Sequence, residues 1–416
     1  MNRRFFLHKG AVALAGTAAL PNFLVRSVLA ETNAHPGRRL VVIFQRGAAD
    51  GLNVVVPYRE KNYYAMRPTI AIPQNRVLDL DGFFGLHPSL ASFKPLYDAG
   101  HLAIVHAAGS PSMNRSHFDA QDYMESGTPD NKSTTDGWLN RALQAEDACP
   151  CARHRQEHTA FRALALGAQV PLTLAGRIPA IALNNVNGFS IAGRGPAFSP
   201  AAQAFEAMYA DSGDRILHAA GDQTFDAVKM LRDANPAQYA PATGANYPNT
   251  AFGNSMRQIA QLLKANLGVE AAFTDVAGWD THQNQGGVNG QLANRLADFS
   301  ASIAAFWRDM GDDAGDITLV TMSEFGRTAR ENGTAGTDHG HANVMFVLGG
   351  DVKGGRVYGK WPGLADEQLN QGRDLALTTD FRTVLGEVVT HAMGAENLNA
   401  VFPGANLDPA RFLRMT

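Results

Sequence analysis

"LVVIFQRGAADGLN", residues 40–53, joins an apolar run to a loop that contains Arg46, Asp50 and Asn53. The run 40–44 has no polar interruption, which is typical of a strand that is buried on both faces of a sheet. The polar residues follow directly, at the carboxyl end of this strand. In open α/β sheets this is the edge at which ligands bind. The stretch therefore predicts an α/β protein with its chemistry at that edge.

The rest of the chain repeats this alternation and predicts one α/β domain over residues 31–416. Continuous apolar strands between helices indicate a mainly parallel central sheet with helices on both faces. Turn-rich sequence at about 128–249 predicts a long insertion that could cover the active edge. The further strands are expected at 102–106, 269–274, 317–322 and 344–348, and the helices at 88–97, 116–125, 291–310 and 381–393.

The composition allows a large core and argues against nucleic acid as a partner. Hydrophobic residues make up 45% of the 416 residues, and charged residues make up 18%. The formal net charge is -3, and no lysine- or arginine-rich block occurs. A nucleic-acid-binding surface normally requires such a basic patch.

The N-terminus predicts a twin-arginine export signal over residues 1–30. Arg3 and Arg4 precede a mild apolar stretch, and "VLA" at 28–30 has the small-residue character of a cleavage site. The apolar stretch is short for a membrane-spanning helix. We therefore expect a periplasmic or extracellular protein that is exported folded, with no stable membrane span after cleavage. An ordinary secretory signal or a membrane anchor is the alternative.

The two cysteines, Cys149 and Cys151, are separated by one residue. A disulfide across one intervening residue would be strained. A surface loop is the favoured interpretation, and a metal-binding dithiol with His154 nearby is the alternative.

Polar clusters follow the first four predicted strands at the same edge of the sheet. The fifth predicted strand is instead preceded by its cluster, "GTDHGHAN" at 336–343, on a loop that returns from that edge. Sequence-distant segments would thus converge on one crevice. The other clusters contain Ser112, Ser116, His117 and Asp119 after the second strand, Asp280 and His282 after the third, and Glu324 and Arg327 after the fourth.

Carboxylates and imidazoles in these clusters predict one or two divalent metal ions, either zinc, manganese or iron. A pair of ions would clamp a phosphoryl or sulfuryl group during displacement. For each cluster alone, a turn or a polar loop is an alternative interpretation. The candidate ligands are Asp50, Asp280, His282, Asp338, His339 and His341.

Ser116 is the candidate nucleophile, with Ser112 in reserve. "SHFD" fits a helix start in which Ser116 is the cap and Asp119 closes a capping box. The positive end of a helix would stabilise an alkoxide or a phosphoserine there. Arg46 and Arg327 could hold an anionic substrate by bidentate hydrogen bonds, or could form loop salt bridges with Asp50 and Glu324. Trp279 is expected to be a packing residue.

Four segments together resemble a bacterial family of twin-arginine-exported proteins of about this length. They are "RGAADGLN", "NRSHFDAQDYMESG", "GWDTHQNQ" and "SEFGRTARENGTAGTDHGHANVMFVLGG", and the resemblance spans nearly the whole mature chain. The family is regarded as a distant branch of the alkaline-phosphatase-like superfamily, which includes phosphatases, sulfatases and cofactor-independent phosphoglycerate mutases. The resemblance implies an α/β fold with two metals and a nucleophile at a helix start.

Residue by residue, the resemblance implies that Asp50 holds one metal and that Ser116 is the nucleophile. It matches Asp280 and His282 to the aspartate–histidine pair of the other metal, and His339 or His341 to the late histidine. One departure concerns Phe325. The superfamily has adjacent aspartate and histidine after the fourth strand, where this chain has Ser323, Glu324 and Phe325. Glu324 could replace the aspartate, and Asp338 with His339 could supply the missing pair.

These observations predict an exported metal-dependent hydrolase of phosphate or sulfate esters, with an anionic small molecule or glycan ester as substrate. Phe325 favours an alternative, a catalytically degenerate member that acts as a surface binding or assembly protein. A phosphotransferase or mutase that works through a phosphoserine is a third possibility.

Overall fold

The computed structural model describes residues 37–148, 158–186, 229–231 and 238–407. Within them the main feature is a nine-stranded sheet in the order β11-β5-β10-β9-β1-β8-β6-β7, with β12 also pairing with β5. The strands are β1 (Arg39–Arg46), β5 (Leu102–Gly109), β6 (Ala163–Leu166), β7 (Ile181–Leu183), β8 (Ala271–Ala277), β9 (Ile317–Ser323), β10 (Asn343–Gly349), β11 (Arg356–Tyr358) and β12 (Thr379–Asp380).

The sheet is mainly parallel, as the sequence predicts. Strand β1 pairs in parallel with both β8 and β9, whereas β10 is antiparallel to both of its neighbours, β5 and β9. Since β10 runs in the opposite direction, it starts at the edge where the other strands end. The loop before β10 therefore lies at the carboxyl edge of the sheet, which confirms the placement expected for "GTDHGHAN".

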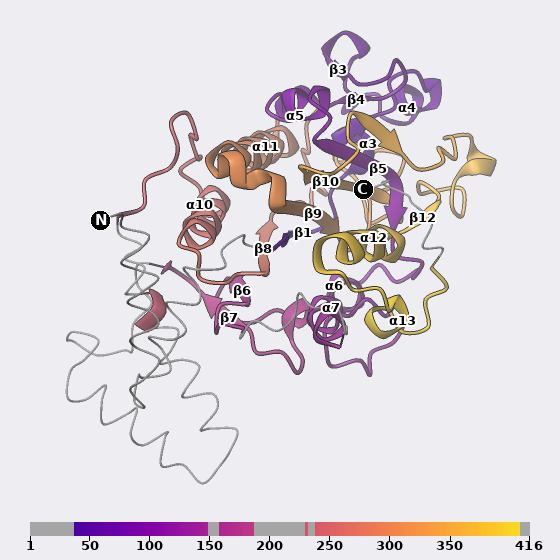
Figure 1. Ribbon diagram of the computed structural model, residues 1–416. Coiled ribbons are helices and arrows are strands. Elements are labelled where there is room, and N and C mark those ends of the chain that lie inside the picture. Colours follow the sequence, from indigo (N-terminus) through magenta and orange to yellow (C-terminus); the bar gives the residue numbers. More distant parts are fainter. Residues whose placement is uncertain (1–36, 149–157, 187–228, 232–237, 408–416) are drawn as a thin grey trace, which may run out of the picture.

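Helices cover both faces of the sheet (Figure 1), and the alternation of side chains along β1 explains why. Val41 and Ile43 face a core formed with α10 and α11, whereas Leu40, Val42 and Phe44 face a core formed with α7 and α12. Burying each such side chain contributes about 1.5–3 kcal/mol. The helices are α3 (Gly51–Val54), α4 (Lys61–Met66), α5 (Lys94–Asp98), α6 (His117–Ser126), α7 (Trp138–Asp147), α10 (Ala251–Lys264), α11 (Gln291–Met310), α12 (Phe381–Met393) and α13 (Leu398–Val401).

The predicted strands and the helices α6, α11 and α12 are confirmed, with α11 and α12 at the expected bounds. The helix expected at 88–97 is wrong as a single element. It divides into a short 3-10 turn, η2 (Pro88–Leu90), and α5, which starts at Lys94. Pro95 explains the break, because proline lacks the amide donor and clashes with the preceding turn.

Short elements complete the described chain. A small antiparallel sheet, β2-β4-β3, lies outside the central sheet and was not predicted. Its strands are β2 (Val55–Val56), β3 (Leu78–Asp79) and β4 (Gly85–Leu86), and the remaining 3-10 turns are η1 (Gln74–Arg76), η4 (Leu172–Leu174), η7 (Gly311–Asp316) and η8 (Asp366–Gln368).

The described part of residues 128–249 is built into the main domain. Strand β6 pairs with β8, and β7 pairs with β6, so this region extends the sheet sideways. Helix α7 contributes Trp138, Leu139 and Leu143 to the core that contains α12. Much of this region, including Cys149 and Cys151, lies outside the described residues, as does the predicted export signal.

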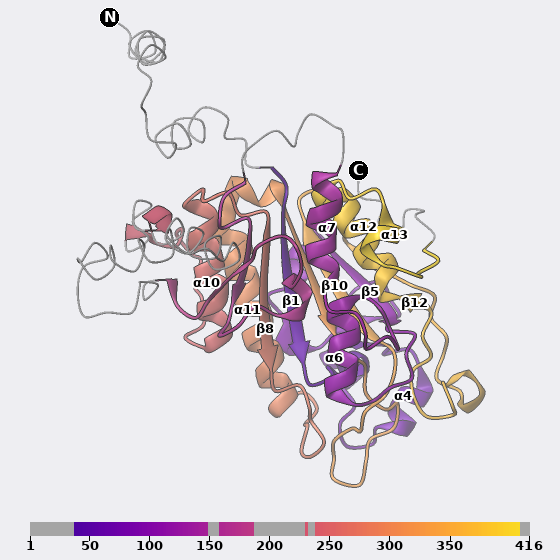
Figure 2. The ribbon, with the colours of Figure 1, turned by 90° about the horizontal axis from the view of Figure 1, so that it is seen from below.

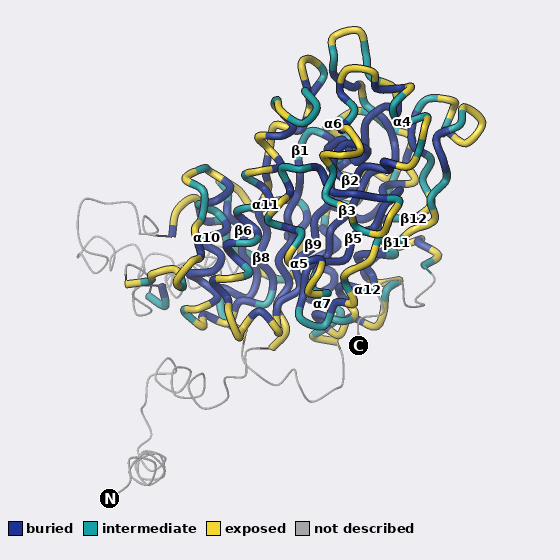
Figure 3. The backbone as a smooth tube through the Cα atoms, turned by 90° about the horizontal axis from the view of Figure 1, so that it is seen from above, coloured by how far each residue is buried: buried dark blue, intermediate teal, exposed yellow. Residues whose placement is uncertain are grey.

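The interior is formed by the central strands, and the exposed residues lie mostly on the outer helices and loops (Figure 3). Trp279 is fully buried and packs edge-on against Phe299 of α11, which confirms its expected role. Among the described residues, no helix is both long and apolar enough to cross a lipid bilayer.

A buried carboxylate attaches the segment before α10 to α11. Asp309 is 1% exposed and accepts hydrogen bonds from Lys264 Nζ (2.5 Å), the backbone nitrogen of Ala242 (2.8 Å), and the hydroxyls of Tyr239 and Tyr247. Burial alone raises the pKa of Asp309. The hydrogen bonds from Lys264 and Tyr239 outweigh burial and hold the pKa of Asp309 below its usual range.

We expect Asp309→Asn to lower the free energy of unfolding by about 2 kcal/mol at pH 7, because an amide keeps only one of the two buried oxygens that accept from Lys264, Ala242 and the two tyrosines. The folded-state pKa of Asp309 is depressed, so its contribution is complete above about pH 4 and is lost as the pH falls below that value. Denaturant unfolding should be measured at pH 7 and below pH 4. The difference in the free energy of unfolding between variant and wild type should be smaller in acid. Asp312→Asn, an exposed residue of η7, is the control. A difference that stays constant with pH would contradict this account.

Candidate metal centre

Loops from four strands meet at the carboxyl edge of the central sheet. In Figure 2, β1 runs toward the end of the sheet where α6 lies. The loop after β5 leads into α6, the loop after β8 carries Asp280 and His282, and the loop between β9 and β10 carries residues 324–342. The fold therefore brings together polar residues that are more than 200 positions apart.

Three histidine side chains converge on the carboxylate of Asp280. Asp280 Oδ1 lies 2.9 Å from His282 Nε2 and 3.3 Å from His339 Nε2, and Asp280 Oδ2 lies 3.5 Å from His117 Nε2. The ligand atoms of His117, Asp280 and His339 all lie within 4.8 Å of one another. This group could hold a metal ion, and His282 stands next to it.

Each of the three rings is oriented by an acceptor at its other nitrogen. His117 Nδ1 lies 2.8 Å from Glu324 Oε1, and His282 Nδ1 lies 3.0 Å from Asp338 Oδ1. His339 Nδ1 lies 3.0 Å from the carbonyl oxygen of Arg115. Because carboxylates and carbonyls only accept, each Nδ1 carries the proton and donates it. Each Nε2 is then available to a metal, which is the usual arrangement of histidine ligands.

The donor atoms fit a cation. His282 Nε2 and His339 Nε2 are 3.0 Å apart, so two lone pairs cannot face each other there without a proton or a cation between them. His117 Nε2 is buried and makes no hydrogen bond in the described residues. Imidazole nitrogens with one carboxylate suit zinc, and also suit iron or manganese.

The charges around the centre are set by the surrounding partners. The hydrogen bond to Glu324 raises the pKa of His117, although burial opposes this. Burial lowers the pKa of His339, and the nearby charge of His117 lowers it further. Burial alone raises the pKa of Asp280, but the hydrogen bond and charge of Arg327 outweigh it and keep this carboxylate ionised.

Arg327 connects the loop after β8 with the loop between β9 and β10. Its side chain is fully buried, and Nη1 donates to Asp280 Oδ1 at 2.6 Å. Its Nε and Nη2 donate to the hydroxyl and the carbonyl of Thr337. Arg327 thus positions a ligand and does not face a substrate. This corrects the expectation that it would clamp an anion.

The glycines of "GTDHGHAN" allow the loops to approach this closely. A Cβ on Gly336 would lie 2.2 Å from the carbonyl oxygen of His282, and one on Gly340 would lie 2.3 Å from the carbonyl carbon of Arg327. Neither distance is compatible with a side chain. The backbone contact between Arg327 and His339 depends on this approach.

Glu324 and Phe325 take different roles beside the centre. Glu324 is buried and also accepts from the backbone nitrogen of Gly47 at 2.8 Å and from Gln121 at 3.0 Å, so it supports His117 and does not face the metal position. Phe325 packs against the rings of His117 and His339, at centroid distances of 5.0 and 4.9 Å. An apolar ring therefore occupies the second position after β9, beside two of the three histidines.

Asp50 lies outside this group, which corrects its assignment as a ligand. Its carboxylate is 1% exposed and forms a bidentate pair with Arg67, at 2.6 and 2.9 Å. Gln285 donates to Asp50 Oδ2 at 2.6 Å. All three hydrogen bonds that this carboxylate accepts from side chains come from buried residues, Arg67 and Gln285.

Arg46 and His341 also lie outside the group. Arg46 donates to Asp275, Gln121 and Glu125, so its charge is neutralised by two carboxylates. His341 is buried, and its Nε2 lies 3.0 Å from the carbonyl oxygen of Ser110. Arg46 thus forms salt bridges, which was the alternative interpretation, but with Glu125 and Asp275 and not with Asp50. His341 contacts a main-chain carbonyl instead of joining the other candidate ligands.

Ser116 stands at the start of α6, directly before His117. It is exposed, and its side chain does not cap the helix. The predicted capping box is wrong, because Asp119 instead accepts from Asn114 and pairs with Lys132. Ser112 is buried and donates to Asp130 at 2.5 Å, which leaves Ser116 as the accessible serine.

Sequence reasoning missed His117 as a candidate ligand. It noted His117 in the cluster after the second strand but interpreted "SHFD" only as a helix start. The available signal was a histidine in the first turn of a helix at the active edge. Its partner Glu324 lies 207 positions away, so only the fold reveals the pair.

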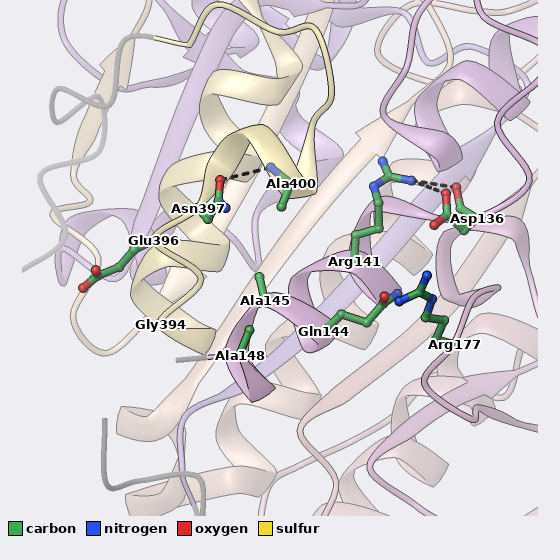
Figure 4. Close-up of a pocket in the computed structure, with 10 residues that line it drawn as sticks. All are labelled: Asp136, Arg141, Gln144, Ala145, Ala148, Arg177, Gly394, Glu396, Asn397 and Ala400. Carbon is green, nitrogen blue, oxygen red and sulfur yellow. Dashed lines mark hydrogen bonds and ion pairs between the residues drawn. The ribbon is translucent and has the colours of Figure 1, made fainter. Parts of the chain in front are cut away.

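A cavity elsewhere in the molecule has no part in this centre. It has a volume of about 510 Å³ and lies between α7 and the segment 394–400 (Figure 4). Arg141 lines it but is already bound to Asp136. None of the residues that line it belongs to the centre around Asp280.

A family model described as "Protein of unknown function (DUF1501)" matches residues 37–400. A search of curated proteins found no match. Among solved structures, the chain is similar to the C-terminal periplasmic domain of EcEptC from Escherichia coli in complex with Zn. The identity is 10% and the TM-score is 0.35, and the similarity covers 76% of this chain and 73% of that chain.

Two structures of the alkaline phosphatase PafA are also similar. A quadruple mutant gives 10% identity and a TM-score of 0.33, and the wild type gives 11% identity and a TM-score of 0.26. Each similarity covers 71% of this chain and 64% of PafA, so the chain spans less than two thirds of that protein. These similarities are too distant to assign a role to any residue.

We expect the protein to bind zinc through His117, Asp280 and His339. His339→Gln and His117→Gln should weaken zinc binding, measured by equilibrium dialysis, by more than the roughly 10–100-fold expected for an outer-shell change such as Glu324→Gln. His341→Gln is the matched control from the same loop and should keep the wild-type affinity. Equal losses in His339→Gln and His341→Gln would contradict the assignment.

Asp50→Asn should destabilise the protein without removing the metal. Leaving Arg67 buried without its partner should lower the free energy of unfolding by about 3–5 kcal/mol. The folded protein should keep a zinc affinity close to that of the wild type, as measured in the same dialysis experiment. A variant of normal stability that has lost its metal would restore Asp50 as a ligand.

Proposed function

The chain belongs to the DUF1501 family of proteins of unknown function, and we propose that it is an exported metal-dependent hydrolase of phosphate or sulfate esters. The observation that supports this proposal is the convergence of three histidines on Asp280, each with its Nδ1 already bound. Such a preformed set of nitrogen and oxygen donors at the ligand-binding edge of an α/β sheet is typical of a catalytic metal site.

The residues of the chain would hold one divalent ion at His117, Asp280 and His339, with His282 as a further donor. When bound, such an ion supplies a Lewis acid that polarises a phosphoryl or sulfuryl oxygen. Arg327 keeps Asp280 ionised and in place. Glu324, Asp338 and the Arg115 carbonyl keep each histidine in the tautomer that presents Nε2.

Ser116 is the proposed nucleophile. It is exposed and precedes the ligand His117, so its Cα lies about 3.8 Å from that of a residue of the centre. It stands at the start of α6, a helix of 10 residues, whose positive end favours a developing alkoxide. Its side chain makes no hydrogen bond to another described residue. No such bond would therefore have to break before the hydroxyl reacts.

The route of export forms part of the proposal. Arg3 and Arg4 with the following apolar stretch support a twin-arginine signal, although residues 1–36 lie outside the described residues. Export of the folded chain would allow the metal to be bound before the protein reaches the periplasm. The expected substrate is an anionic small-molecule or glycan ester.

A second candidate, a binding protein without turnover, is favoured by Phe325. This ring packs against two of the histidines and lies where a second metal would need a ligand. A single centre with an apolar neighbour could bind an anionic glycan or a partner protein without hydrolysing it.

Turnover of aryl esters by the metal-loaded protein tests the two candidates. We expect release of phosphate or sulfate from phenyl esters, and we expect Ser116→Ala to lower kcat by on the order of a thousandfold while the bound metal remains. Ser133→Ala, another exposed serine, is the matched control. Full metal occupancy without turnover of any ester in a broad panel would reject the hydrolase and favour the binding protein.

A further inference from the structure

Two arginines share one buried carboxylate beside the metal centre. Arg115 Nη2 donates to Asp374 Oδ2 at 2.5 Å, and Arg373 Nε lies 3.7 Å from Asp374 Oδ1. The side chain of Asp374 is fully buried, whereas those of Arg115 and Arg373 are 25% and 41% exposed. Two positive charges thus face one negative charge, and the surplus positive charge is accessible to solvent.

Both arginines contact His339, Arg115 through its main-chain carbonyl and Arg373 through its guanidinium. His339 Nδ1 donates to the carbonyl oxygen of Arg115, and Arg373 Nη2 donates to the carbonyl oxygen of His339 at 2.6 Å. The opposite nitrogen, His339 Nε2, faces Asp280. The Arg373 guanidinium therefore lies against the main chain of a candidate ligand, and Arg115 Nη2 joins it at the carboxylate of Asp374.

These guanidinium groups have donors that no described residue uses. Arg115 Nε is buried without a hydrogen-bond partner. In the described part of the chain, Nη1 of Arg115 and Nη1 of Arg373 also donate no hydrogen bond. Arg46 and Arg327 differ in this respect, because each uses all three of its nitrogens on partners within the protein.

We propose that Arg115 and Arg373 bind a second anionic group of the substrate, so that the preferred ester carries a carboxylate or a sulfate in addition to the group that reacts. This inference rests on the proposed function and names the substrate class for the same site. Guanidinium groups bind carboxylate and sulfate by charge-assisted hydrogen bonds, often in bidentate fashion. Their contacts within the described residues go to Asp374, Gln371 and a main-chain carbonyl, and none goes to a candidate ligand side chain, so they suit a second group on the same molecule and not the reacting group.

Binding of unreactive analogues tests the inference without requiring turnover. The probes are phenylphosphonate and its meta- and para-carboxy and sulfo derivatives, titrated by calorimetry into the metal-loaded full chain. We expect the best carboxy or sulfo derivative to bind the wild type roughly tenfold more tightly than phenylphosphonate itself. The carboxy and sulfo compounds together show which of the two anions is preferred.

Arg373→Ala should remove this preference and leave the affinity for phenylphosphonate unchanged. Arg115→Met, which keeps the apolar stem, should have the same effect. Agreement between the two variants would show that the loss does not come from a folding defect in one of them. Arg330→Ala is the control, because Arg330 is 53% exposed and pairs with Asp366, away from the centre. A wild type without the preference, or an Arg373→Ala variant that keeps it, would overturn the inference.

The outcomes separate this inference from the proposed function. Hydrolysis of phenyl esters without any preference for the second anion would support the hydrolase and reject the arginine subsite. A preference that Arg373→Ala removes, in a protein that hydrolyses none of the corresponding esters, would support the subsite and reject the hydrolase.

Discussion

The ion pair between Arg327 and Asp280 is the interaction on which the centre depends. Arg327 follows β9 and Asp280 follows β8, and β1 lies between these two strands in the sheet. The guanidinium is fully buried, so without Asp280 it would be an uncompensated charge in the interior. Its remaining donors attach the loop before β10 through Thr337. One buried cation thus connects two loops, the loop after β8 and the loop between β9 and β10, and positions Asp280.

A network of buried hydrogen bonds extends from Arg327 to Asp50 and Arg67. Gln285 donates to Asp50 and accepts from the hydroxyls of Thr281 and Thr337, and Thr337 in turn accepts from Arg327. Asp50 completes the network through its pair with Arg67. In such satisfied networks each polar group depends on its neighbours, so a residue that does not touch the metal can still determine where the ligands stand.

The charges around the centre also separate two kinds of arginine. Arg46 and Arg327 are matched by carboxylates and act within the protein. Arg115 and Arg373 share a single carboxylate, are partly exposed, and keep donors that no described residue uses. Their difference does not lie in residue type or in distance from a strand end. It lies in the balance of nearby charge, which is a property of the folded molecule.

The sequence by itself determined the α/β class, five strands of the central sheet, the helices α6, α11 and α12, and the edge at which the candidate site lies, because apolar periodicity and strand-end position are local properties. It also singled out Asp280, His282, Asp338 and His339, which the fold brings together. Only the tertiary structure decided which of the equivalent-looking residues meet. Asp50 and His341 satisfy interior partners, whereas His117 turns its Nε2 to Asp280 because Glu324, far along the chain, holds its other nitrogen. Such partners are set by strand order and loop packing, which no local pattern of residues records.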